Sequence, residues 1–138
     1  MSSRIIRLSL ILLNGFLALT AIPGGLALLT GTMAPPVEYL AGSPFPDYVV
    51  PGLALAVLVG GSSLITTFLL VTRPRLGGPA ALATGLAIII FETVEVLAIG
   101  SPLGVARNLQ ILYYTVGILI VLASLMPVAE LRRSLIRS

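Results

Sequence analysis

The chain has 138 residues, of which 57% are hydrophobic and only 9% carry a charge. About a quarter of the residues of a soluble domain are charged, so this composition excludes a soluble globular protein and predicts a membrane protein of one domain. The chain has no cysteine and no histidine, which excludes disulfides, thiol chemistry and the usual haem and zinc ligands.

A first membrane-spanning helix is predicted over residues 5–29, where a long apolar run follows Arg4 and Arg7. At about 1.5 Å per residue the run is long enough to cross a hydrocarbon core of roughly 30 Å. A signal peptide also begins with basic residues, but its apolar segment is shorter, so we expect a retained helix. Pro23 cannot donate a hydrogen bond to the carbonyl of Leu19. We therefore expect a kink or early unwinding there, either as a loosened helix end or as a free carbonyl for an ion or substrate.

Residues 30–49 form the longest polar connection, and their prolines forbid a regular helix through it. We expect an ordered cap that lies on the bundle at the membrane surface, with room for one short helical turn. Phe45, Tyr39 and Tyr48 are expected to dip into the lipid headgroup layer, because aromatic side chains favour that interface.

A second helix is predicted over residues 50–71. Gly52, Ala56 and Gly60 recur there at every fourth residue, which gives a flat stripe where another helix can approach closely. The serines and threonines that follow are expected to bond back to their own backbone, and they carry little functional weight for that reason.

Two further helices are predicted over residues 79–99 and 108–125. A short basic link at residues 72–79 precedes the third helix, and a turn at residues 100–107 leads to the fourth. Residues 129–138 have the pattern of a basic amphipathic tail, which is expected to lie along an anionic membrane surface.

The arginines predict the orientation of the chain. Seven of the eight basic residues lie in the N-terminal segment, the 72–79 link and the tail, and only Arg107 lies elsewhere. By the positive-inside rule, both termini are expected in the cytoplasm of a prokaryotic cell, with an all-α, four-helix, antiparallel up-down bundle in its plasma membrane. The net charge of +3 does not indicate nucleic-acid binding, because the arginines stand at the ends of apolar runs.

Most of the strongly polar side chains of the spans fall into one layer in the outer half of the bundle. Counting from each helix centre at about 1.5 Å per residue places Glu92 about 5 Å outside the midplane and Glu95 about one turn higher. The same count places the other members at matching depths, with the arginine at the outer rim: Thr20, Gln110, Tyr113, Tyr114 and Arg107.

Glu92 and Glu95 are three residues apart, so they share one face of their helix. A carboxylate near the bilayer centre costs roughly 2.5–3.5 kcal/mol, so the pair should face the bundle interior. Two close carboxylates in a low dielectric resist double ionisation, and one is expected to hold a proton unless a cation lies between them. Arg107 is the expected ionic partner of Glu95, and the tyrosine hydroxyls are expected to donate to the charged carboxylate.

Three interpretations of this layer stay open: a buried network that fixes helix pairing, a proton or cation relay or small-cation site, and a contact with a partner subunit or a lipid headgroup. The chain offers no nucleophile–base pair and no metal cluster, so we expect no enzymatic activity, metal or cofactor. The leading functional hypothesis is a structural or accessory helix-bundle subunit, as a homo-oligomer or in a larger membrane complex. The alternative is a proton- or cation-coupled small-molecule carrier that uses Glu92 and Glu95.

Three stretches of the chain resemble a class of small four-helix integral membrane proteins from bacteria with arginine-rich, lysine-poor proteomes. They are Pro-Gly-Gly at residues 23–25, the segment from Ser43 through Tyr48 into Pro-Gly-Leu at 51–53, and the segment from Phe91 to Glu95. In that class an aromatic residue, often tryptophan, stands four positions before the acid. Phe91 takes its place here, and Glu92 is an additional acid. The resemblance implies four helices and no particular activity.

Overall fold

The computed structural model describes residues 3–137, except for the side chains of residues 128–135. In chain order the helices are α1 (Ser3–Thr30), η1 (Val37–Leu40), α2 (Val49–Leu53), η2 (Ala54–Gly61), α3 (Ser62–Thr72), α4 (Pro74–Ile99) and α5 (Val105–Arg137). The second span comprises α2, η2 and α3, which follow one another without a break, and η2 is a π-helix. Together with α1, α4 and α5 it gives four helices long and apolar enough to cross a membrane.

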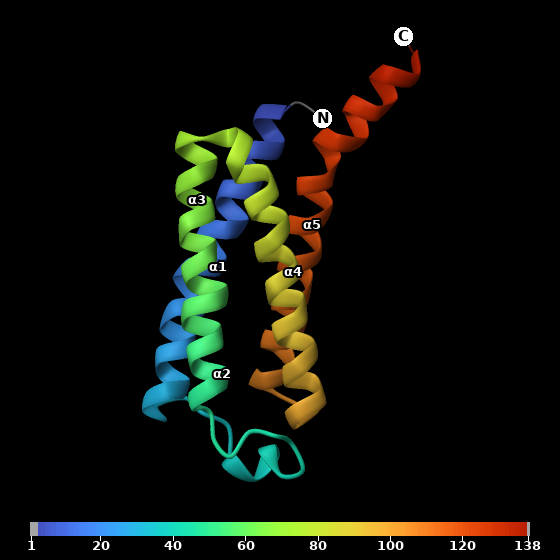
Figure 1. Cartoon of the computed structure of the whole chain (residues 1–138). Coiled ribbons are helices and arrows are strands. Elements are labelled where there is room, and N and C mark those ends of the chain that lie inside the picture. The colour runs from blue at the N-terminus through green and yellow to red at the C-terminus, as the bar shows by residue number, and fades with distance from the viewer. Residues whose placement is uncertain (1–2, 138) are drawn as a thin grey trace.

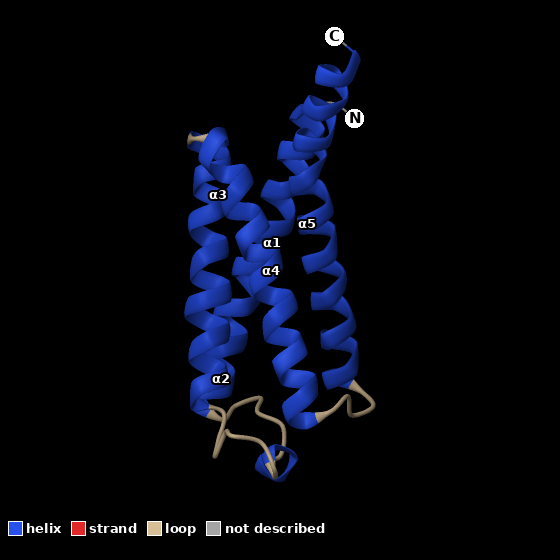
Figure 2. Ribbon diagram, turned by 45° about the vertical axis from the view of Figure 1, so that its right-hand side comes forward, coloured by secondary structure: helices blue, strands red, loops and turns tan. Residues whose placement is uncertain are grey.

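The four spans run antiparallel in chain order, so both termini lie at one end of the bundle, the terminal end (Figure 1). The connections at residues 31–48 and 100–104 lie together at the opposite end, the cap end (Figure 2). α1 and α4 each pack against the second span and against α5, whereas the backbones of α5 and the second span do not come close to each other within the described residues. This arrangement confirms the predicted all-α, four-helix antiparallel bundle.

Large apolar side chains are exposed on all four spans. Examples from successive spans are Leu19 at 78%, Phe68 at 66%, Leu97 at 82% and Leu122 at 56% exposure. Soluble proteins rarely expose so continuous an apolar surface to water, whereas membrane proteins expose one to the hydrocarbon of the bilayer. The chain is therefore a multi-pass membrane protein.

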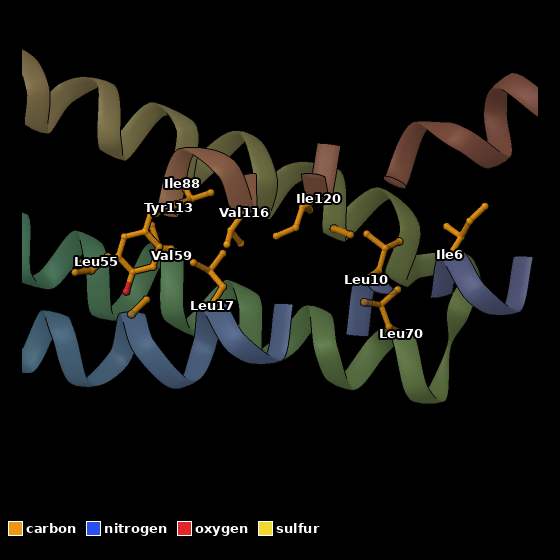
Figure 3. Packing of buried hydrophobic residues seen from close by; sticks show 12 residues of the cluster. Ile6, Leu10, Leu17, Leu55, Val59, Leu70, Ile88, Tyr113, Val116 and Ile120 are labelled. Atoms are coloured by element: carbon orange, nitrogen blue, oxygen red, sulfur yellow. The ribbon is translucent and has the colours of Figure 1, made fainter. Parts of the chain in front are cut away.

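A continuous apolar core fills the middle and the terminal half of the bundle (Figure 3). Its most tightly packed members come from all four spans: Leu17, Val59, Ile88 and Ile120. One polar pair lies within this half, where Thr84 Oγ1 donates to Asn14 Oδ1 at 2.6 Å and so joins α4 to α1. The terminal half is thus closed by packed side chains.

Small residues allow α1 and the second span to lie very close together. The predicted stripe of Gly52, Ala56 and Gly60 faces α1, and a Cβ added at Gly60 would come within 2.5 Å of Ile22 Cγ1. On α1, a Cβ added at Gly25 would lie 2.5 Å from the backbone nitrogen of Ala56. The two backbones approach each other at these glycines because no side chain separates them.

Arg7 joins the terminal end of α1 to the terminal end of the second span. Its Nε donates to the carbonyl oxygen of Leu70 at 2.8 Å, and its Nη2 donates to that of Val71 at 2.9 Å. The last carbonyls of a helix have no donor within the helix, so the guanidinium supplies the missing partners. We call this contact the terminal clamp.

The link predicted at residues 72–79 is wrong, because α4 already begins at Pro74 and only Arg73 separates it from α3. Proline suits the first position of a helix, where its missing N–H is not needed. It also excludes the helical conformation at the preceding residue, and Arg73 accordingly has φ −140° and ψ 72°. The sharp turn between α3 and α4 therefore depends on a single proline.

Two other prolines lie inside helices without ending them. α1 continues through Pro23 to Thr30, so the expected early unwinding there is wrong. α5 continues through Pro127 to Arg137 and extends past the terminal end (Figure 1). An unpaired backbone group finds no water in a bilayer, which favours an unbroken helix around a single missing bond. Most side chains of the predicted amphipathic tail at 129–138 lie outside the described residues.

Candidate functional site

Glu92 and Glu95 lie on α4 in the cap-end half of the bundle. Glu92 is only 1% exposed, and Glu95 is half-buried. Their carboxyl groups lie near each other on one face of α4, and both line the same cavity. Two neighbouring carboxylates repel each other in a low dielectric, so a proton or another cation between them would stabilise the pair. In addition, Oε2 of Glu92 receives no hydrogen bond from any described donor.

The carboxyl pair forms part of the wall of a cavity of about 480 Å³, the end cavity. Residues of α1, α4, the first turns of α5 and the cap line the end cavity, which is open to the surface on one side. Its remaining lining includes Gly24, Ala27, Leu28, Met33, Ala34, Pro35, Tyr39, Leu55, Phe91, Pro102, Leu103, Val105, Ala106, Leu109 and Tyr113. None of these residues is basic, so the two acids have no neutralising partner in the wall.

A second cavity of about 370 Å³, the lateral cavity, lies between the second span and α4, under the cap. Its lining is almost entirely apolar, and Glu95 is the only charged residue in it. Leu28, Phe91 and Glu95 line both cavities. The half-buried carboxyl of Glu95 is therefore reachable from two sides, one of them polar and the other apolar.

The cap covers both cavities and is held in place by its own hydrogen bonds. The Tyr48 hydroxyl donates to the carbonyl oxygen of Pro36 at 3.2 Å, and Asp47 Oδ1 accepts from the backbone N–H of Val49 at 3.0 Å. Burial raises the pKa of the Tyr48 phenol, and the negative charge of Glu95 raises it further. Tyr48 is buried, so the expectation that it dips into the headgroup layer is wrong. Phe45 lines the lateral cavity and Tyr39 is 43% exposed, and for these two the expectation stays a prediction.

The structure brings two more members of the predicted polar layer to the carboxyl pair. Tyr113 is buried and lines the end cavity opposite Glu92 and Glu95. Its side chain lies near Thr20 on α1, whose Oγ1 donates to the carbonyl oxygen of Phe16 at 2.9 Å. Glu92, Glu95 and Tyr113 line the end cavity, whereas Thr20 lies beside Tyr113 and does not line it.

The other three members of the layer point elsewhere. Arg107 donates to the backbone oxygen of Ser101 at 3.1 Å from Nε and 2.6 Å from Nη2, so the expected pair with Glu95 is wrong. The Tyr114 hydroxyl lies 2.9 Å from Thr93 Oγ1 on the exposed face of α4, and it does not reach a carboxylate.

Gln110 is buried but ties α5 to the end of α4. Its Nε2 donates to the carbonyl oxygen of Gly100 at 3.0 Å, and its Oε1 has no described partner. This hydrogen bond holds the start of α5 next to the end of α4, on either side of the 100–104 connection. Gln110 itself does not line either cavity.

Sequence reasoning missed the lateral cavity and the inward-facing residues of the cap. The signal for the cavity is a row of alanines on the facing helices, Ala54 in η2 and Ala87 and Ala98 in α4. Small side chains in an otherwise bulky apolar helix leave space where two helices diverge. The signal for the cap is its aromatic residues, which face a cavity as readily as a headgroup layer.

Comparison of the chain with models of known families, with curated proteins and with solved structures finds no match. The function is therefore inferred from the geometry of the site.

Proposed function

We propose that this multi-pass membrane protein binds a small organic cation at Glu92 and Glu95, through the end cavity, in exchange for a proton. The observation that carries the proposal is a pair of neighbouring acids, one buried and one half-buried, without a basic partner in the wall of an open cavity. An ammonium group can replace a proton between two carboxyl groups, because each contributes one positive charge. A shared proton bridges the two groups, and an ammonium group donates hydrogen bonds to both.

The residues around the pair suit an organic cation. Glu95 is half-buried and meets the ligand first, while Glu92 is deeper and keeps the compensating charge or proton. Phe91 lines both cavities and offers an aromatic face, which attracts cations. The remaining apolar lining excludes water and strengthens the charge contact.

An unpartnered polar atom argues for a ligand over a purely structural network. A buried network that only fixes helix pairing is stable when all its members have partners. Here Glu92 Oε2, in the wall of the end cavity, receives no hydrogen bond from any described donor. The packed terminal half supports no path from the site to the terminal end, so carrier activity requires a second conformation.

The proposal is tested by titrating purified protein in nanodiscs with n-butylammonium in a weakly buffered solution, with heat and pH recorded together. The wild type is expected to bind and to release a proton. Glu95→Gln is expected to weaken binding by about 10- to 100-fold, because a hydrogen bond to a charged group contributes about 1.5–3 kcal/mol. Glu92→Gln is expected to abolish proton release.

Glu38→Gln is the matched control, because Glu38 is an exposed acid of the cap and lines neither cavity. It is expected to bind like the wild type. Wild-type protein that binds no butylammonium, together with Gln variants of lowered thermal stability, would overturn the proposal in favour of a structural or accessory subunit.

A further inference from the structure

We propose that the ligand is an amphipathic amine from the bilayer, with its ammonium group at Glu95 and its alkyl chain in the lateral cavity. This inference rests on the cation site proposed above and specifies its ligand. A membrane amine with one positive charge and one unbranched tail is the occupant that the shape and the charge of the lateral cavity fit.

The lateral cavity lies where hydrocarbon surrounds the protein. Its rim is formed by Leu58 on the second span and Ile90 on α4, which are 66% and 62% exposed on the outer surface of their helices. Both residues lie well inside their spans, Val49–Thr72 and Pro74–Ile99. The cavity is not enclosed, so its opening between these helices faces lipid chains.

The depth of the cavity along α4 suits an alkyl tail. Its lining on α4 extends from Ala87 to Ile99, and the rise between these two residues is about 18 Å along a helix. Glu95 lies toward the cap end of this stretch, and Ala87 lies about 12 Å from it in the direction of the bilayer centre. A ligand with its head at Glu95 therefore extends its tail along the helix towards the middle of the membrane.

The charges that line the lateral cavity favour a simple amine over a phospholipid as its ligand. Glu95 is the only charged residue in the lateral cavity, and no basic residue lines either cavity. A phosphate group next to Glu95 would place like charges together without a counter-ion, which costs several kcal/mol in such surroundings. A primary ammonium meets the carboxyl with opposite charge and leaves no polar group of its own in the apolar part.

The test is competition against tritiated n-butylammonium in nanodiscs of zwitterionic lipid. Unlabelled n-alkylammonium ions of four, six and eight carbons are compared with n-octanol. In the wild type each added methylene is expected to improve competition by up to about fourfold, since a buried methylene contributes about 0.8 kcal/mol. Octanol is expected to compete at least tenfold more weakly than octylammonium, because it lacks the charge.

Ala87→Leu fills the far end of the lateral cavity and is expected to remove the gain with chain length while butylammonium still binds. Ala54→Leu does the same from the second span and serves where Ala87→Leu fails to fold. The matched control is Ala83→Leu, one turn from Ala87, because Ala83 is exposed and lines neither cavity. This control is expected to keep the full dependence on chain length.

The outcomes separate the two proposals. If the wild type binds no butylammonium, the proposed cation site itself is wrong. Normal butylammonium binding with no dependence on chain length, or with equal dependence in Ala87→Leu and Ala54→Leu, overturns the amphipathic ligand alone. Octadecylammonium stays in the bilayer and is expected to compete with the tritiated butylammonium. If octylammonium competes and octadecylammonium does not, the ligand does not enter from the bilayer.

Discussion

Tyr48 is a single side chain on which the cap over both cavities depends. Replacing it by phenylalanine removes its hydrogen bond to Pro36 and leaves that carbonyl without this donor, at a cost of about 1 kcal/mol. Tyr48→Phe is therefore expected to speed amide hydrogen exchange in residues 36–48, while the four spans keep their protection. Tyr39→Phe is the control, because Tyr39 is 43% exposed and is expected to leave the cap unchanged.

The same bond has a defined pH range. Because burial raises the pKa of Tyr48 above its usual value of 10.0, the phenol is still protonated in the folded chain where it would ionise in an unfolded one. Its contribution to stability is thus fully present below about pH 10 and is lost as the pH rises through the raised value. Protection factors of the cap amides, which are corrected for the intrinsic rise of exchange with pH, would contradict this if they fell already near neutral pH in the wild type.

At the scale of single residues, helix geometry made part of the site predictable. The fixed rise per residue gives the depth of each side chain in the membrane. This depth alone placed Thr20, Glu92 and Tyr113 near one another, with Glu95 about one turn above them. Depth does not give the direction in which a side chain points around its helix. The partner of Arg107 was mispredicted for a related reason, because Ser101 lies six residues away in the same connection and is reached without crossing the bundle.

Close packing between α1 and the second span is the feature of the helices most sensitive to mutation. Gly25→Ala places a Cβ 2.5 Å from Ala56 N and from Gly52 O, which are backbone atoms that cannot turn aside. The two helices must separate, and we expect a loss of about 1–3 kcal/mol in the free energy of unfolding. Thermal unfolding in detergent measures it.

Gly15→Ala is the matched control on the same helix, since a Cβ added there meets nothing within 4 Å. Alanine is favoured over glycine inside a helix, so this variant is expected to be as stable as the wild type or slightly more so. Equal stability of the two variants would show that α1 and the second span are not held at the distance described.

Helices were predictable as elements because an apolar run of about 20 residues has few alternatives in a membrane. Their ends were less predictable. Pro74 and Pro79 are both acceptable near a helix start, so the sequence alone does not distinguish them. In the structure α4 starts at Pro74, and Gly77 within it lies close to Leu70 of α3. The π-helical stretch Ala54–Gly61 has no sequence signal that we recognise.

For the whole molecule, the arginines predict that the cap end faces outward and the terminal end faces the cytoplasm. The chain has no cysteine, so single introduced thiols report on one position each. Ala41→Cys in the cap and Ser3→Cys at the terminal end are both exposed. In intact cells a membrane-impermeant maleimide is expected to label Ala41→Cys only, and permeabilised cells are expected to label both. The reverse pattern would place the carboxyl pair within reach of the cytoplasm.

The terminal clamp gives the bundle a pivot. Arg7 fixes α1 to the second span at one end, while the cavities leave the other end of the bundle hollow. A rod held at one end moves most at its free end: a tilt of about 5° over a span of about 30 Å displaces the far end by about 2.6 Å. α4 is joined to the second span at the same end through Arg73, so a tilt of α4 against the second span is expected to change the width of the lateral cavity far more than it disturbs that turn. The cap end is therefore the part of the bundle that we expect to move when a ligand enters.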